Sequence, residues 1–162
     1  MDLVSLLAAR FGRLTNPTLD ELKEALLGIP DLAEWTLPHV TEPSAYPYGR
    51  NVVYANEEVE IIVVHLPAQC RTYIHDHGKS AGCGRVVQGE LTNAVFEAVD
   101  RTTAVKTAEH KVAAGERFVT PHGMIHQMRN DNQERVVSVH VYSPPLQGLK
   151  LYEERQETAF VT

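Results

Sequence analysis

The chain has 162 residues, enough to bury a substantial core, and we expect residues 1–162 to form a single domain. A net charge of −6 and the absence of Lys/Arg runs argue against nucleic acid as a partner, and no apolar stretch approaches the length of a membrane span. Two cysteines are too few for a disulfide framework, and the N-terminus shows no secretion signal, so we expect a cytoplasmic protein with no membrane partner.

The first part of the chain, residues 1–36, shows the periodicity of helices. Apolar residues recur at helical spacing within Leu3–Phe11. After a turn, Thr18 and Glu21 form the pattern of a capping box, which marks the start of a second helix. We therefore expect N-terminal α-helices, followed by an irregular connection over 37–50 that is rich in Pro and Tyr.

From residue 51 the pattern changes to short β-rich runs separated by turn residues. These runs cover 52–66 with a turn at 55–58, then 72–77, 83–88, 91–99, 103–107, 116–120, 126–129 and 136–142. Many short strands at this spacing are typical of an antiparallel sandwich or barrel. We expect a mainly β body over 48–145 and a C-terminal arm without regular structure over 146–162.

Three histidines are candidate ligands of one metal ion. His75 and His77 are two residues apart in a predicted strand, so their side chains share a face. His126 lies on another predicted strand, after a turn rich in Pro and Gly that could bring it beside them. Three imidazoles suit zinc, iron, copper or nickel. The alternative is that they are ordinary core or surface histidines.

The spacing around these histidines resembles the two sequence motifs of the cupin family, which are small double-stranded β-helix (jelly-roll) barrels. The second motif, G-x5-P-x-G-x2-H-x3-N, is matched at every fixed position, by Gly115, Pro121, Gly123, His126 and Asn130. The first motif, G-x5-H-x-H-x3–4-E-x6-G, is matched by His75, His77 and Gly89. It departs at its first Gly, where Gln69 or Cys70 stands, and at its metal-binding Glu, where Gly82 stands. The site would then hold three neutral histidines, which favours an anionic ligand such as a thiolate or a carboxylate.

The predicted strand near the C-terminal end of the β body carries a polar face. Ser138, His140 and Tyr142 alternate with three valines, so the three polar side chains point the same way. A core-facing strand would normally carry apolar residues on that face. The pattern indicates either a relay in an active site or a hydrogen-bonded structural network.

A longer resemblance covers about two thirds of the chain and is to the thiol dioxygenases, and within them to the short bacterial type of the cysteine dioxygenase family. The matching segments are Tyr48-Gly49-Arg50-Asn51, His75-Asp76-His77, Gln88-Gly89, His126 with Asn130, and the run from Ser138 to Pro145. The resemblance implies a non-haem Fe(II) enzyme that oxidises L-cysteine with O2 to cysteine sulfinic acid.

Carried over residue by residue, the resemblance also implies roles for the matching side chains. His75, His77 and His126 would bind Fe(II). Arg50 would form a salt bridge to the substrate carboxylate, supported by Tyr48. The hydroxyl of Tyr142 would face the substrate and oxygen, held by His140, which Ser138 would orient.

The same resemblance leads to further expectations about the backbone and about Tyr142. The Ser143–Pro144 peptide would be cis, as in the family. Mammalian members cross-link a cysteine to the active-site tyrosine, and Gly82 occupies that position here, so we expect an unmodified Tyr142 with free space beside it. The neighbouring Cys83 should face away as a small buried apolar residue.

The implied partners are a small-molecule thiol and O2, with the chain a monomer or a weak homo-oligomer. Two alternatives remain. One is a dioxygenase for another small thiol such as 3-mercaptopropionate, although such enzymes typically carry Gln where Arg50 stands. The other is a cupin that binds a metal without catalysis.

Overall fold

The computed structural model of the chain describes residues 1–156 and begins with three helices. These are α1 (Leu3–Phe11), α2 (Leu19–Leu27) and α3 (Leu32–Thr36), followed by a short 3-10 helix, Leu37–His39. The predicted capping box is confirmed: the Thr18 side chain accepts from the Glu21 amide, and the Glu21 carboxylate accepts from the Thr18 amide. No helix within residues 1–156 is long and apolar enough to cross a membrane.

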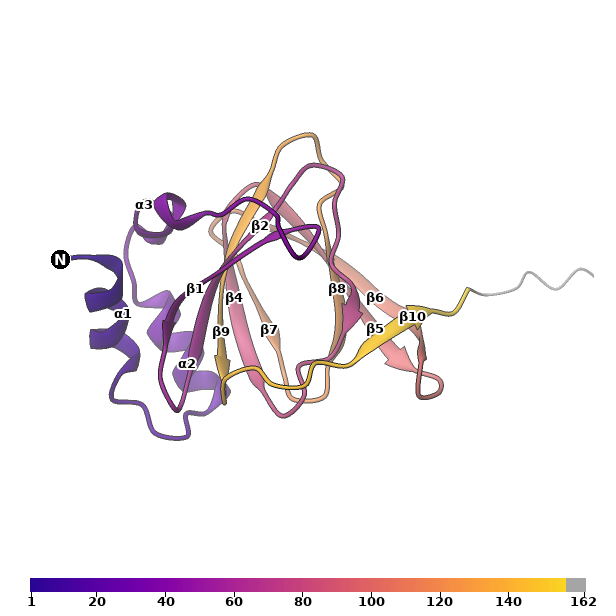
Figure 1. Cartoon of the computed structure of the whole chain (residues 1–162), viewed down its shortest axis with the longest axis horizontal. Coiled ribbons are helices and arrows are strands. Elements are labelled where there is room, and N and C mark those ends of the chain that lie inside the picture. The colour runs from indigo at the N-terminus through magenta and orange to yellow at the C-terminus, as the bar shows by residue number, and fades with distance from the viewer. Residues whose placement is uncertain (157–162) are drawn as a thin grey trace, which may run out of the picture.

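The rest of the described chain forms ten strands in two sheets (Figure 1). The first sheet has the order β1-β2-β9-β4-β7, with bounds β1 Gly49–Ala55, β2 Glu60–Leu66, β4 Ala81–Gln88, β7 Arg117–Thr120 and β9 Val136–Ser143. The second has the order β10-β3-β8-β5-β6, with bounds β3 Ile74–His75, β5 Glu90–Ala98, β6 Thr103–Ala113, β8 Ile125–Arg129 and β10 Leu151–Glu154. Apolar residues of both sheets pack together, and this arrangement confirms the predicted mainly β jelly-roll with N-terminal helices.

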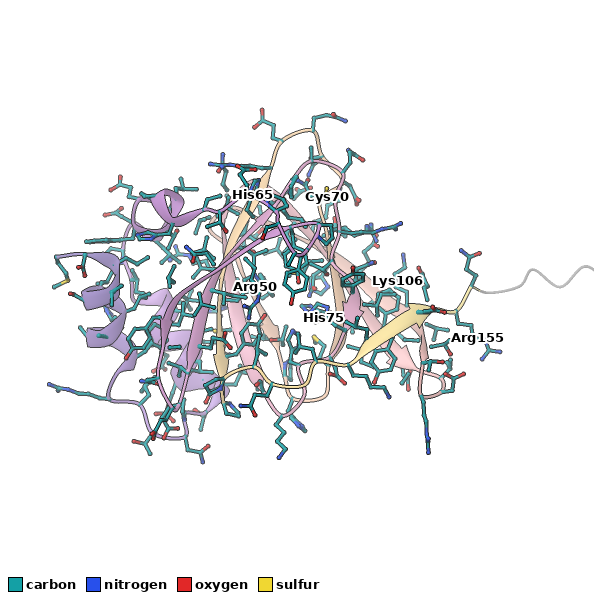
Figure 2. The ribbon with its side chains drawn as sticks, viewed as in Figure 1. Arg50, His65, Cys70, His75, Lys106 and Arg155 are labelled. Carbon is teal, nitrogen blue, oxygen red and sulfur yellow. The ribbon has the colours of Figure 1, made fainter. Side chains whose placement is uncertain are left out.

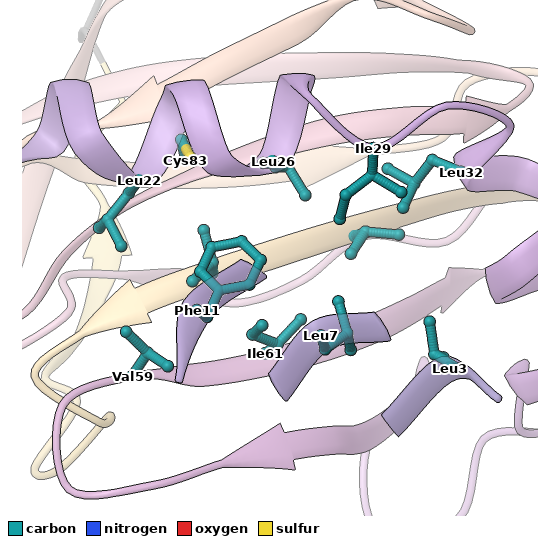
Figure 3. Packing of buried hydrophobic residues seen from close by; sticks show 12 residues of the cluster. Leu3, Leu7, Phe11, Leu22, Leu26, Ile29, Leu32, Val59, Ile61 and Cys83 are labelled. Carbon is teal, nitrogen blue, oxygen red and sulfur yellow. The ribbon is translucent and has the colours of Figure 1, made fainter. Parts of the chain in front are cut away.

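The N-terminal helices cover the outer face of the first sheet (Figures 1 and 3). Their apolar stripes, including Leu7, Phe11 and Leu22, form one buried cluster with Ile61 of β2 and Cys83 of β4. Burying such side chains on both layers supplies the main free energy that holds helices to sheet. The opposite face of this sheet is thereby left to line the interior of the barrel, where the site lies.

The C-terminal arm differs in part from the expectation. It was predicted to be irregular, and from Pro144 to Lys150 it is. The four residues of β10 then pair antiparallel with β3 and parallel with β6, which closes the second sheet into a ring. The last part of the predicted arm, 157–162, lies outside the described residues.

Two predicted strands in the second sheet had wrong lengths. The run predicted at 103–107 extends to Ala113, because exposed residues such as Glu109 still pair with β5. The run predicted at 72–77 is reduced to Ile74–His75. The flanking residues keep single contacts with their neighbours, Thr72 with Met128 of β8 and Asp76 with Lys150, but these do not continue the regular ladder. The strand therefore ends between the first two histidines of the site.

Candidate metal centre

Three histidines from adjacent strands converge inside the barrel. His75 lies directly opposite His126 in the pairing of β3 with β8, and His77 follows just after β3. Their ring centroids are 4.8 to 4.9 Å apart, and their ligand atoms all lie within 4.8 Å of one another. Among the described residues, no other three His, Cys, Asp or Glu side chains are grouped in this way. The structure thus brings together the three histidines that the sequence singled out.

Hydrogen bonds orient two of these rings. Nδ1 of His75 donates to the carbonyl of Tyr73 at 2.7 Å, and Nδ1 of His126 donates to Oδ1 of Asn93 at 2.8 Å. Each bond leaves the Nε2 lone pair of its ring free, as a metal ligand requires. The Nε2 atom of His126 and both ring nitrogens of His77 are buried without a hydrogen-bond partner in residues 1–156. Because buried polar atoms normally have a partner, Nε2 of His126 and one of the two nitrogens of His77 fit a bound metal ion.

Burial also keeps the three rings neutral. Removal from water lowers the pKa of His75, lowers the pKa of His77 to about 3, and lowers the pKa of His126 well below its ordinary value. The neighbouring histidines add to the lowering at His77 and His126, because two positive charges this close would repel each other. A neutral imidazole is the form that binds metal, so no proton has to leave before an ion enters.

The polar face of β9 points into the same space. The Ser138 hydroxyl lies 2.7 Å from Nε2 of His140, and the Tyr142 hydroxyl lies 3.2 Å from Nδ1 of the same ring. Burial lowers the pKa of His140 to about 3, so the ring is neutral, with one N–H and one lone pair. It therefore donates to one hydroxyl and accepts from the other. The Tyr142 ring stacks on His77, with centroids 5.1 Å apart. The hydrogen-bonded series from Ser138 through His140 therefore ends at the metal centre.

Gly82 does not leave free space beside Tyr142, so that expectation was wrong. A Cβ added at Gly82 would meet the carbonyl of Val141 and would lie 2.6 Å from Cδ1 of Tyr142. The phenol ring has taken the space that the missing side chain leaves. The expected orientation of Cys83 is confirmed: its side chain lies in the apolar cluster under α2, on the other face of β4 (Figure 3). The Ser143–Pro144 peptide is cis, as predicted.

Arg50 on β1 and Tyr48 just before it line the pocket beside the histidines. Arg50, His75 and Tyr142 border a narrow cavity of about 30 Å³. Arg50, Tyr48 and His75 also border a wider outer cavity of about 420 Å³, so the two adjoin. Figure 2 shows Arg50 and His75 in the space between the two sheets. Tyr48 stacks on Tyr46, with centroids 5.3 Å apart, and burial raises the pKa of Tyr48.

Two acidic residues in or near the first cupin motif, Asp76 and Glu90, do not join the metal centre. Asp76 accepts hydrogen bonds from the amides of Gly78 and Lys150, which ties the C-terminal arm to the histidine segment. Glu90 lies near Lys111 on the surface. Within the described residues the centre therefore offers three neutral ligands and no carboxylate.

Sequence reasoning missed two polar side chains that shape this site, Asn93 and Glu60. Asn93 orients His126, and Glu60 contacts Arg50 at 3.3 Å. Glu60 opens a strand whose later residues are apolar except for His65, and Asn93 precedes the apolar run Ala94–Phe96 of β5; a polar residue beside such a run was the available signal. A polar residue in such a run predicts a partner, but the run itself does not show which one.

The sequence comparison decides the family. The profile of the family described as cysteine dioxygenase type I matches residues 21–155, which is most of the chain. The chain belongs to this family. Cysteine dioxygenase type 1 of Rattus norvegicus is 26% identical over 128 residues, covering 76% of this chain and 63% of that protein. The Danio rerio protein is 27% identical over 116 residues, covering 68% and 58%. The chain thus spans less than two thirds of the length of these curated relatives.

Solved structures support the fold. A protein with a double-stranded β-helix domain from Klebsiella pneumoniae matches with a TM-score of 0.60 at 20% identity, over 73% of this chain and 89% of that one. The cupin domain of Cnp3 from Schizosaccharomyces pombe matches with a TM-score of 0.55 at 15% identity, over 68% and 72%. At these identities the likeness extends to the fold alone. It confirms the predicted cupin barrel for this member of the cysteine dioxygenase type I family.

Proposed function

We propose that the protein is a thiol dioxygenase that converts L-cysteine and O2 into cysteine sulfinic acid. The observation that supports this most directly is a cluster of three neutral histidines, two of which line adjoining cavities together with one guanidinium and one phenol. Such a pocket offers a metal for the sulfur, a positive charge for a carboxylate and a hydroxyl for the reacting atoms. Membership of the cysteine dioxygenase type I family supports the same reaction class.

Fe(II) is the metal that we propose for His75, His77 and His126. Bound there, Fe(II) would supply the coordination positions and the electrons that allow O2 to react with a thiolate. The three ligands contribute no negative charge, so the pocket favours the thiolate over the thiol. The reaction balances without another reductant, because both oxygen atoms of O2 end on the substrate sulfur, which is oxidised.

The protein's own residues would bind and orient the substrate. Arg50 presents a guanidinium at the junction of the two cavities, where it would pair with the cysteine carboxylate, and Tyr48 would donate its hydroxyl to the same group. At the other side, burial raises the pKa of Tyr142, so its hydroxyl stays protonated and would donate to the reacting sulfur or oxygen atoms. His140 and Ser138 would hold that hydroxyl in place.

The test is a substrate panel with the protein loaded with Fe(II) under anaerobic conditions. Cysteine, 3-mercaptopropionate and cysteamine are each mixed with oxygenated buffer, and O2 uptake and sulfinate are measured together. We expect cysteine sulfinic acid, with one O2 consumed for each product molecule. Preference for 3-mercaptopropionate would make the protein a dioxygenase for that thiol. No O2 uptake with any thiol would contradict the enzymatic proposal and favour a cupin that only binds metal.

The role of Arg50 has its own test. Replacing Arg50 with Gln removes the charge while keeping a polar side chain, so we expect the KM for cysteine to rise by about tenfold or more. Arg101→Gln, at an exposed turn between β5 and β6, is the matched control and should behave as the wild type. If Arg50→Gln turned over cysteine unchanged, the assignment of Arg50 to the substrate carboxylate would be wrong.

A further inference from the structure

Glu60 is a carboxylate in a place where the strand pattern calls for an apolar residue. It is the first residue of β2, and every later residue of that strand is buried, with only His65 polar among them. Its side chain is only 13% exposed and borders the outer cavity together with Arg50. A carboxylate removed this far from water is costly unless both of its oxygens have partners.

Both oxygens of Glu60 do have partners, and the partners come from different parts of the barrel. Oε2 lies 3.3 Å from Nη2 of Arg50 on β1. Oε1 accepts a hydrogen bond of 2.9 Å from the amide of Leu146, in the segment that follows β9. Leu146 borders both cavities as well, so Glu60 links the guanidinium to the chain segment beside it.

The contact with Glu60 restricts Arg50 without using up its hydrogen-bonding capacity. A guanidinium carries five N–H donors, and Glu60 is the one hydrogen-bond acceptor that Arg50 contacts in the described part of the chain. The remaining donors are available to a carboxylate in the pocket. Arginine has a long and flexible side chain, so holding it in place before the substrate arrives removes an entropic cost of binding.

We propose that Glu60 is a positioning residue that holds Arg50 ready for the substrate carboxylate, an inference that rests on the proposed function. Glu60 itself touches neither sulfur nor metal in this scheme. Its effect should therefore appear with thiols that carry a carboxylate and should be absent with thiols that lack one.

The experiment measures binding by calorimetry, with protein loaded with Fe(II) and kept anaerobic so that no turnover occurs. The two probes are cysteine and cysteamine, which has the same thiol and amine but no carboxylate. For Glu60→Ala we expect the Kd of cysteine to rise by about tenfold and that of cysteamine to change by less than about twofold. For Glu60→Gln, which keeps only one accepting oxygen, we expect an intermediate loss of cysteine binding. Glu97→Ala, an exposed carboxylate on β5, is the control.

A double variant separates positioning from a general structural role. If Glu60 acts through Arg50, adding Glu60→Ala to Arg50→Gln should weaken cysteine binding no further. Equal weakening of cysteine and cysteamine, additive losses in the double variant, or unchanged binding by Glu60→Ala would each overturn the inference. Failure of the wild type to bind cysteine would overturn it as well. Cysteine binding without O2 uptake would instead contradict the proposed dioxygenase and leave the positioning role measurable.

Discussion

The ring of Tyr142 lies against the backbone of Gly82 on the neighbouring strand, where the two residues are direct partners in the pairing of β9 with β4. A Cβ at Gly82 would lie 2.6 Å from Cδ1 of the tyrosine and would also meet the carbonyl of Val141. The absence of a side chain at position 82 therefore sets where the phenol can sit. Its hydroxyl reaches His140 and its ring face reaches His77 from this position.

We predict that Gly82→Ala lowers both stability and activity. The added methyl group cannot be accommodated by moving the tyrosine alone, because a backbone carbonyl is also in its way. Overpacking of this kind costs about 1–3 kcal/mol, and urea denaturation would measure it as a loss in the free energy of unfolding. Ala81→Ser, at the half-buried neighbouring position of the same strand, is the control and should cost less. If the urea concentration at the midpoint of unfolding were the same for Gly82→Ala as for the wild type, β4 and β9 would be able to separate more easily than the structure indicates.

Removing the Tyr142 hydroxyl should affect turnover more than binding. In Tyr142→Phe the ring can still pack against Gly82 and His77, but His140 loses a partner and, in the proposed reaction, no hydroxyl would donate to the reacting atoms. We expect kcat for cysteine to fall by about tenfold or more while KM and metal content stay near the wild-type values. Tyr152→Phe, a half-buried tyrosine on β10, serves as the control. A rise in KM with an unchanged kcat would mean that the hydroxyl only binds substrate.

Local patterns predicted the elements in which polar and apolar residues alternate between two faces. Ser138, His140 and Tyr142 face the interior of the barrel, where they are hydrogen-bonded in series, while the valines between them pack under the helices on the other side, as period-two alternation requires. The end of β6 and the whole of β10 carried no such signal. Their side chains are largely exposed, and they are strands only because their backbones pair with other strands.

The first cupin motif predicted the backbone conformation even at a position where this chain lacks the residue of the motif. Gln69 stands where the first motif has glycine, and its φ is +61°, in the region that favours glycine. The backbone turn is therefore retained without the residue that usually permits it. The partners of Glu60 and Asn93 could not be predicted, because Leu146 is 86 residues away from the first and His126 is 33 residues away from the second.

Asn93 should control metal affinity through His126. Its Oδ1 accepts from Nδ1 of the histidine at 2.8 Å in a fully buried contact, which fixes the orientation of the ring. For Asn93→Ala we expect metal affinity to fall by about 10- to 100-fold, measured by competition with a chromophoric chelator. Asn93→Asp keeps an accepting oxygen at that position and should retain more of the affinity. If both variants bound metal like the wild type, the hydrogen bond would have no part in holding the ligand.

The two cysteines should differ sharply in reactivity. Burial beneath α2 raises the pKa of the Cys83 thiol to about 12, so at pH 8 it is fully protonated and also shielded from reagents. Cys70 is only half-buried and borders an open surface cavity. Because the thiolate is the reactive form, we expect a disulfide reagent at pH 8 to modify Cys70 rapidly in the native protein and Cys83 only after unfolding in guanidinium. The Cys70→Ser variant should lack the rapid phase, whereas Cys83→Ser should keep it. Rapid modification of both thiols in the native wild type would show that the helices open away from the sheet on the time scale of the reaction, which would contradict the tight packing of Cys83 against Leu22 and its neighbours.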